Sequence, residues 1–228
     1  MSAPDYAIVR RPRRKTLCIC IKPNNDIEVL APLSISNSEI ARFVVSKRDW
    51  IRGKQAFNTN VRMPYRPKHF KDGENFTLLG RDYMLQLCRS EEPCIEWIDG
   101  YLKLKLPDTG NPSAIERKIE HEYRIQAQAK IEELCVEYSS MIGVEPRSVG
   151  IKKYRSRWGS CHHDGRIYFN WRIIMAPEPV VRYVVVHELC HLLHANHSKA
   201  YWQTVASHVP DYRQNTEWLK INGLSLAL

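Results

Sequence analysis

The stretch Pro179-Val-Val-Arg-Tyr-Val-Val-Val-His-Glu-Leu-Cys-His-Leu-Leu-His-Ala-Asn-His-Ser198 joins an apolar run to a cluster of histidines. In a helix, His187 and His191 lie one turn apart on the same face, so both imidazoles can point at one metal ion. Glu188 follows His187 directly, where a carboxylate can hold a metal-bound water without being a ligand. Because the residues before His187 can bury one side of the helix, the sequence predicts a buried metal site.

His197 offers a third imidazole ten residues after His187. Asn196 can adopt the left-handed conformation that ends a helix, and such a turn would bring His197 back toward the other two histidines. Three protein ligands with one open position are typical of a catalytic zinc rather than a structural one. The alternative is a histidine-rich helix end on which His194 and His197 are surface residues.

The composition favours a soluble protein of one large domain or two small ones. The chain has 228 residues, of which 43% are apolar, enough for a real core. No apolar run reaches the ~18 residues that cross a bilayer and no signal-peptide segment is seen, so we expect a cytoplasmic protein without membrane contact. Seven cysteines at irregular spacings, none in a CxxC pair, are typical of a reducing compartment and argue against a thiolate zinc site.

A net charge of +9 favours anionic partners such as nucleic acid or nucleotide phosphates. The densest basic run is Arg10-Arg-Pro-Arg-Arg-Lys15. It is either a nucleic-acid contact or a solvated strand and turn. The sequence gives no indication of the oligomeric state.

Residues 1–108 are expected to form a β-rich N-terminal domain, mostly antiparallel, with one helix. The strand candidates are 17–21, 27–30, 76–79, 83–88, 94–98 and 101–106. Asp99-Gly100 between the last two predicts a tight hairpin. The capping box Ser36-Asn-Ser-Glu39 predicts the start of a helix that reaches about Gly53.

Residues 109–228 are expected to form a helical, zincin-like domain with a small hairpin beside the cleft, which makes the whole chain α+β. Asn111-Pro112 begins a long helix that Gly143 can end in the left-handed conformation. Strand candidates 149–154 and 166–171, with a turn signal at His163-Asp-Gly165, predict the hairpin. The later helices are expected to begin near Pro177, Ser198 and Pro210.

A series of short motifs runs in order through the last third of the chain. They are Arg157-Trp-Gly-Ser-Cys161, Asn170-Trp-Arg172, Ala176-Pro177, Val186-His-Glu-Leu-Cys-His-Leu192, Asn196-His-Ser198, Tyr201-Trp202 and Pro210-Asp-Tyr212. In these motifs the sequence resembles the YgjP-like metallopeptidase-domain family and, more distantly, the SprT and Spartan proteases. The resemblance implies a gluzincin-like fold, in which a helix bundle carries the metal and a short sheet lies beside the cleft.

By position, the resemblance also implies that His187, His191 and His197 are the metal ligands and that Glu188 is the general base. The leading hypothesis is therefore a zinc-dependent metallopeptidase in which Glu188 activates a zinc-bound water. Candidates for contact with the oxyanion or the substrate are Arg157, Tyr154, Tyr212 and Asn170. Strand 166–171 can hold an extended peptide by adding it to its edge.

Two other functions stay open from the sequence. Some members of the family are described as nucleoside triphosphate pyrophosphatases that act on UTP, which makes a nucleotide the alternative substrate. A non-catalytic module is the third hypothesis: zinc would join the C-terminal helices and the basic surface would bind nucleic acid. The metzincin class is rejected, because His194 replaces the turn glycine and no methionine follows Met175.

Overall fold

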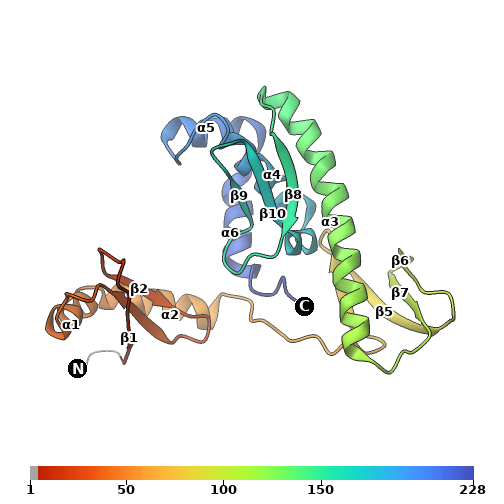
Figure 1. Cartoon of the computed structure of the whole chain (residues 1–228), viewed down its shortest axis with the longest axis horizontal. Coiled ribbons are helices and arrows are strands. Elements are labelled where there is room, and N and C mark those ends of the chain that lie inside the picture. Colours follow the sequence, from red (N-terminus) through yellow and green to blue (C-terminus); the bar gives the residue numbers. More distant parts are fainter. Residues whose placement is uncertain (1–4) are drawn as a thin grey trace. The chain divides into compact units, whose positions relative to one another are not determined.

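The computed structural model describes residues 5–228 (Figure 1). Within that range it holds six α-helices and three small sheets, which confirms the expected α+β class. The chain divides into two compact units, Met1–Pro64 (unit 1) and Tyr65–Leu228 (unit 2). This division differs from the expected boundary after residue 108. The reason is that strands between residues 75 and 106 share one hydrophobic core with the histidine-bearing helix.

Unit 1 is a three-stranded sheet with two helices on one face. The elements are β1 (Ala7–Arg10), β2 (Cys18–Ile21), β3 (Ile27–Ala31), α1 (Asn37–Ser46) and α2 (Arg48–Asn60). The strand order is β1-β3-β2, with β1 parallel and β2 antiparallel to β3. Alternate residues of β3 point inward, and Val29 packs with Ile40, Val44 and Ile51 of the helices.

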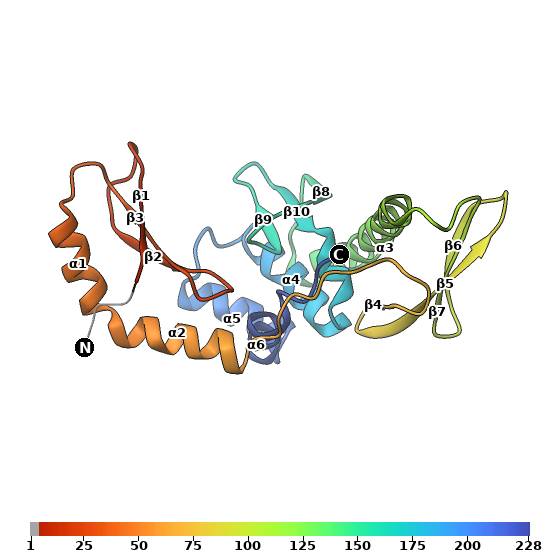
Figure 2. The same ribbon diagram turned by 90° about the horizontal axis from the view of Figure 1, so that it is seen from below.

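The single helix expected from Ser36 to about Gly53 is two helices that meet at Lys47, where the chain changes direction (Figure 2). Its start is confirmed, because Ser36 and Glu39 form the predicted capping box. The break follows Val44-Val45-Ser46, where β-branched side chains lower helix propensity and the Ser46 hydroxyl bonds back to the Phe43 carbonyl at 2.7 Å.

Unit 2 begins with a four-stranded sheet. Its strands are β4 (Asn75–Leu78), β5 (Arg81–Arg89), β6 (Cys94–Ile98) and β7 (Tyr101–Leu106), in the order β4-β5-β7-β6. The predicted hairpin at Asp99-Gly100 is confirmed, since both residues have positive φ, 52° and 78°. The expected mostly antiparallel arrangement is confirmed for three of the five strand pairs described before residue 108, and β5–β7 and β1–β3 are parallel.

The long helix α3 (Pro112–Ile142) spans from the four-stranded sheet to the next sheet (Figure 1). Both predicted ends are confirmed: the Asn111 side chain caps the first turn, and Gly143 closes the last at φ 78°. Its buried face packs against α4 (Glu178–Cys190) and the 3-10 helix η1 (Trp171–Met175). No helix within residues 5–228 combines the length and apolarity needed to span a membrane.

The third sheet consists of β8 (Ser148–Lys152), β9 (Gly159–Cys161) and β10 (Arg166–Asn170), in the order β8-β10-β9. The hairpin is β9–β10, turning at Gly165, and not the predicted pair 149–154 with 166–171, which is parallel. Residues 153–158 link β8 to β9, which lies on the other side of β10, so β9 and not β8 precedes β10 in the hairpin. Both edges of β10 are paired, and the predicted peptide-binding edge at 166–171 is therefore wrong.

The four-stranded sheet fixes the start of α4. At the β4–β5 turn the Leu79 N–H donates to the Ile174 carbonyl at 2.8 Å. Gly80 has φ 77°, and a Cβ there would lie 2.9 Å from the Pro177 Cα, so only glycine fits this contact. The expected helix starts are confirmed, because α4 follows Pro177, and α5 (Lys199–His208) and α6 (Tyr212–Asn222) follow Ser198 and Pro210.

Candidate metal centre

Three histidine side chains converge at the end of α4. His187 lies in its last turn, His191 is the residue after the helix, and His197 comes from the loop before α5. One ring nitrogen of each lies within 4.8 Å of the others. The Nε2 atoms of His187 and His197 are 3.2 Å apart. All three residues predicted as ligands therefore meet at one point.

The bend that returns His197 is built differently from the prediction. Asn196 was expected in the left-handed conformation, but it is not among the residues with positive φ. Instead, the His194 N–H donates to the Cys190 carbonyl at 3.0 Å, and the Ser198 N–H donates to the Asn196 carbonyl at 2.9 Å. The Ser198 hydroxyl then caps α5 by accepting from the Tyr201 N–H at 3.3 Å.

A hydrogen bond and burial keep imidazoles of this cluster in the neutral form that binds metals. The His191 Nδ1 lies 3.1 Å from the His194 carbonyl, which only accepts, so Nδ1 carries the hydrogen and Nε2 keeps its lone pair. Burial, with the nearby His191 and His197, lowers the pKa of His187 to about 3, and burial also lowers the pKa of His191. Neutral imidazoles are the metal-binding form, so this donor set fits a divalent transition metal.

Aromatic residues of α5 hold the histidines in place. The fully buried Tyr201 donates its hydroxyl to the His187 carbonyl at 3.0 Å, and its ring stacks on His191 with centroids 4.7 Å apart. Trp202 stacks on His197 at 5.5 Å. The motif Tyr201-Trp202 did not by itself predict this supporting role. Their position just after the third histidine was the available signal.

Glu188 is buried, with 6% of its surface exposed, and packs against β9. A Cβ at Gly159 would lie 2.5 Å from the Glu188 Cγ and Oε1, so the close approach requires glycine. Burial raises the pKa of Glu188 to about 7, although a hydrogen bond from the Cys161 backbone and the charge of Arg157 lower it. The carboxyl group can therefore take up and release a proton near neutral pH.

A cavity of about 360 Å³ opens beside Glu188 and His187. Loop and strand residues, α4 and α6 form its wall: Arg157, Trp158, Gly159, Tyr183, Val184, Thr216, Leu219 and Lys220. Arg157 and Lys220 are the two cations of this wall. A substrate in the cavity would thus meet the carboxyl group and a ring of the histidine cluster together.

Two of the four candidate substrate contacts lie close to the carboxyl group or to β9. Arg157 lines the cavity, and its charge acts on Glu188. Tyr154 has its hydroxyl 2.6 Å from the Ser160 Oγ in β9. Tyr212 is separated from the histidines, because Trp202 stacks between its ring and that of His197.

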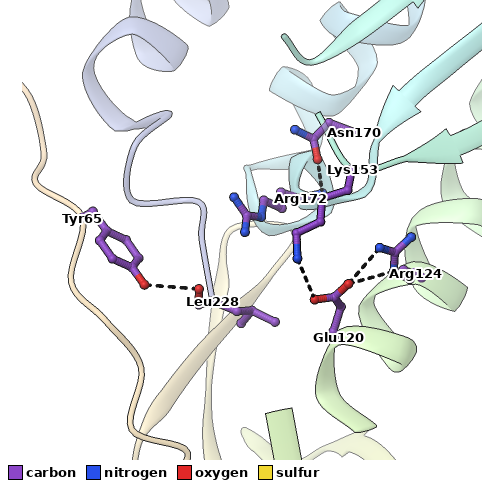
Figure 3. Close-up of polar contacts among 7 residues, drawn as sticks. All are labelled: Tyr65, Glu120, Arg124, Lys153, Asn170, Arg172 and Leu228. Carbon is purple, nitrogen blue, oxygen red and sulfur yellow. Dashed lines mark hydrogen bonds and ion pairs between the residues drawn. The ribbon is translucent and has the colours of Figure 1, made fainter. Parts of the chain in front are cut away.

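The fourth candidate, Asn170, organises the loop before β9. Its Nδ2 donates to the carbonyls of Tyr154 and Arg157 at 3.1 and 3.3 Å. Figure 3 shows its other bond, in which Oδ1 accepts from the Arg172 N–H at 3.3 Å. Both amide hydrogens are thus used within the protein.

The same loop is tied to α3 on its other side. The Lys153 Nζ pairs with Glu120 at 3.3 Å, and Glu120 also pairs with Arg124 at 2.8 Å (Figure 3). Together with the bonds from Asn170, this pair of contacts positions the loop that carries Arg157 to the cavity.

Three comparisons show which known proteins this chain resembles. The sequence model of the YgjP-like metallopeptidase domain matches residues 15–222. A segment of 39 residues is 49% identical to the UTP pyrophosphatase of Escherichia coli strain K12, covering 17% of this chain and 23% of that protein, so the match spans less than a quarter of the relative. The crystal structure of the metallopeptidase zymogen of Pyrococcus abyssi abylysin is similar over 40% of this chain and 96% of that one, with a TM-score of 0.34 and 20% identity.

Proposed function

This chain belongs to the YgjP-like metallopeptidase-domain family, and on that basis we propose that it is a zinc-dependent peptidase. Family membership indicates a metal-dependent hydrolase. That the metal is zinc and the substrate a peptide is our proposal. The observation that carries the proposal is the convergence of three histidines beside a buried carboxyl group at the wall of a cavity.

His187, His191 and His197 would hold the ion through one ring nitrogen each. Three imidazoles and no thiolate suit zinc at a catalytic site, where a fourth position stays open. When bound, zinc supplies a Lewis acid that acidifies water and polarises the oxygen under attack.

Glu188 is the proposed general base. Its carboxylate takes the proton of the attacking water and, as a carboxylic acid, passes it to the leaving amine. A pKa of about 7 suits both steps at neutral pH. Gly159 keeps the carboxyl group in place, and Arg157 lies where it can bind a negative charge at the cavity wall.

The position of β9 at the edge of its sheet supports a peptide as the substrate. The Trp158 carbonyl and the His162 N–H bond to β10 at 2.7 and 2.8 Å. In an antiparallel pair every second residue bonds to the partner strand. Trp158, Ser160 and His162 therefore face β10, while Gly159 and Cys161 direct their backbone groups away from it, where the Cys161 backbone bonds to Glu188. An extended peptide paired along this edge would place its backbone next to the carboxyl group.

The test combines metal analysis with cleavage of casein and of a quenched peptide library. We expect one zinc per chain, and cleavage that Glu188→Gln abolishes while zinc stays bound. Glu91→Gln, which alters an exposed carboxylate in the same way, is the matched control and should cleave normally. Bound zinc without any hydrolysis would instead support the non-catalytic module.

Hydrolysis of UTP is the second candidate. It is favoured by the 39-residue likeness to a UTP pyrophosphatase and by the cations Arg157 and Lys220 on the cavity wall, which suit phosphate groups. Incubation of the loaded protein with UTP, followed by a pyrophosphate assay, distinguishes the two. Glu188-dependent release of pyrophosphate without peptide cleavage would replace the peptidase proposal.

A further inference from the structure

The positive charge of the chain is concentrated in unit 1. Its 64 residues hold twelve Lys and Arg against five Asp and Glu, a net charge of +7. The other 164 residues hold 22 against 20, which leaves +2 of the total +9. The metal centre lies in unit 2, so the proposed hydrolase function does not account for this excess. Such asymmetry between parts of a chain is typical of polyanion binding.

Most of these cations are not neutralised within the protein. In the described part of unit 1, Lys22 alone forms an ion pair, with Glu28 at 2.6 Å. Arg10 is used structurally, because its guanidinium donates to the carbonyls of Pro32 and Ile35 at 3.0 and 2.7 Å. In the rest of the basic run, Arg11, Arg13 and Lys15 are exposed, while Arg14 is half-buried and donates to the Thr16 carbonyl at 2.7 Å. Together these cations give the surface of unit 1 a positive electrostatic potential.

The helix α2 places a large aromatic ring among cations. Lys47, at its N-cap, and Trp50 and Lys54 in its first turns are spaced i, i+3 and i+7 and therefore share one face. All three are exposed, and 47% of the surface of Trp50 is open. Ile51, the buried residue of the helix, lies about 100° further round from Trp50, so the tryptophan ring borders the packed face rather than entering the core. The core of the unit is built without Trp50, so its exposed surface is available to a ligand.

We propose that unit 1 binds single-stranded nucleic acid, with Lys47 and Lys54 on backbone phosphates and Trp50 stacked on a base. A cationic surface that carries an exposed aromatic ring is how proteins hold single strands without reading sequence. The charge comes from the loop after β1 and from both helices, which suits a long flexible polyanion better than a flat bilayer. The shared chemistry covers RNA and single-stranded DNA.

The test measures fluorescence anisotropy of labelled single strands of about 20 nucleotides, as RNA and as DNA, with the full chain at about 50 and about 200 mM salt. Binding should weaken steeply with salt. The variant Lys47→Ala/Lys54→Ala should bind about tenfold more weakly and lower the salt slope by about 1.4, the value for two single-strand phosphate contacts. The matched control Lys105→Ala/Lys199→Ala removes two exposed cations from unit 2 and should bind nearly as tightly as the parent.

Trp50 tests the stacking contact separately from charge. Trp50→Ala should weaken binding about tenfold without altering the salt slope, and Trp50→Phe should restore most of the affinity. Circular dichroism melts of each variant check that unit 1 stays folded. Glu188→Gln should bind the strands normally, so that failure of the hydrolase proposal and failure of this one are distinguishable.

Three results would overturn the proposal. One is the absence of binding at the lower salt concentration. Another is an equal loss in the unit 2 control pair, which would show that net charge alone is responsible. The last is binding to phosphatidylserine vesicles without binding to either oligonucleotide, which would assign the surface to a membrane.

Discussion

The two units differ in where their unusual residues lie. Unit 2 is nearly neutral and places its histidines and Glu188 at the edge of a large core that joins two sheets and four helices. Unit 1 has a small core, with seven buried residues in its described part, and carries its distinctive residues, cations and Trp50, on the surface. A buried catalytic group must be held in position by several helices and strands, whereas a cation on the surface only has to be exposed to its partner. The difference matches the two proposals, hydrolysis in unit 2 and nucleic-acid binding in unit 1.

Loss of one histidine should separate the two activities most strongly. His191→Ala removes one of three ligands, so we expect zinc to fall from about one per chain to near zero and hydrolysis to be lost, by about a thousandfold or more. Metal analysis and the cleavage assay measure this, and His121→Ala on the exposed side of α3 is the control. Oligonucleotide binding should be unchanged; a matching loss there would break the assignment.

Gly159→Ala should be the next largest effect. The added Cβ would lie 2.5 Å from the Glu188 side chain, which must move out of position. Because small displacements of a catalytic group cost about a hundredfold in rate, we expect a loss of that order in kcat with zinc still bound. Normal turnover by this variant would mean that Glu188 does not act from the position seen here.

Gly80→Ala tests the contact between the four-stranded sheet and α4. The residue has φ 77° and faces the Pro177 backbone, so alanine is strained and also clashes. We expect the free energy of unfolding to fall by about 1–3 kcal/mol, measured by urea denaturation. A neutral result would show that the sheet is not firmly packed on α4, and the boundary near residue 108 would regain support.

Gly53→Ala should have the smallest effect and the opposite sign. No atom lies within 4 Å of a Cβ built at this position in α2, and its φ is that of an ordinary helix. Alanine should therefore stabilise the chain by about 0.5–1 kcal/mol, in the same denaturation experiment. A loss of stability would indicate that this face of α2 is covered.

Local sequence signals predicted the helix ends and the chemistry of the site. The caps at Ser36, Asn111 and Ser198 and the glycine at 143 act within a few residues of themselves, so their neighbours in the sequence suffice to read them. The i, i+4 spacing of His187 and His191 likewise needs only a helix. His197 was harder, because its return depends on turns that Asn196 was wrongly expected to make.

What only the tertiary structure decided are the contacts between distant segments. The pairing of β8 with β10, the packing of Gly159 on Glu188 and the stacking of Tyr201 on His191 each join residues that no periodicity relates. The division at Pro64 follows from a core shared by strands and helices far apart in the chain. Residue types and spacing therefore determined which groups can bind a metal and move a proton. The positions of these groups depend on packing between segments far apart in the chain, which no local sequence pattern predicts.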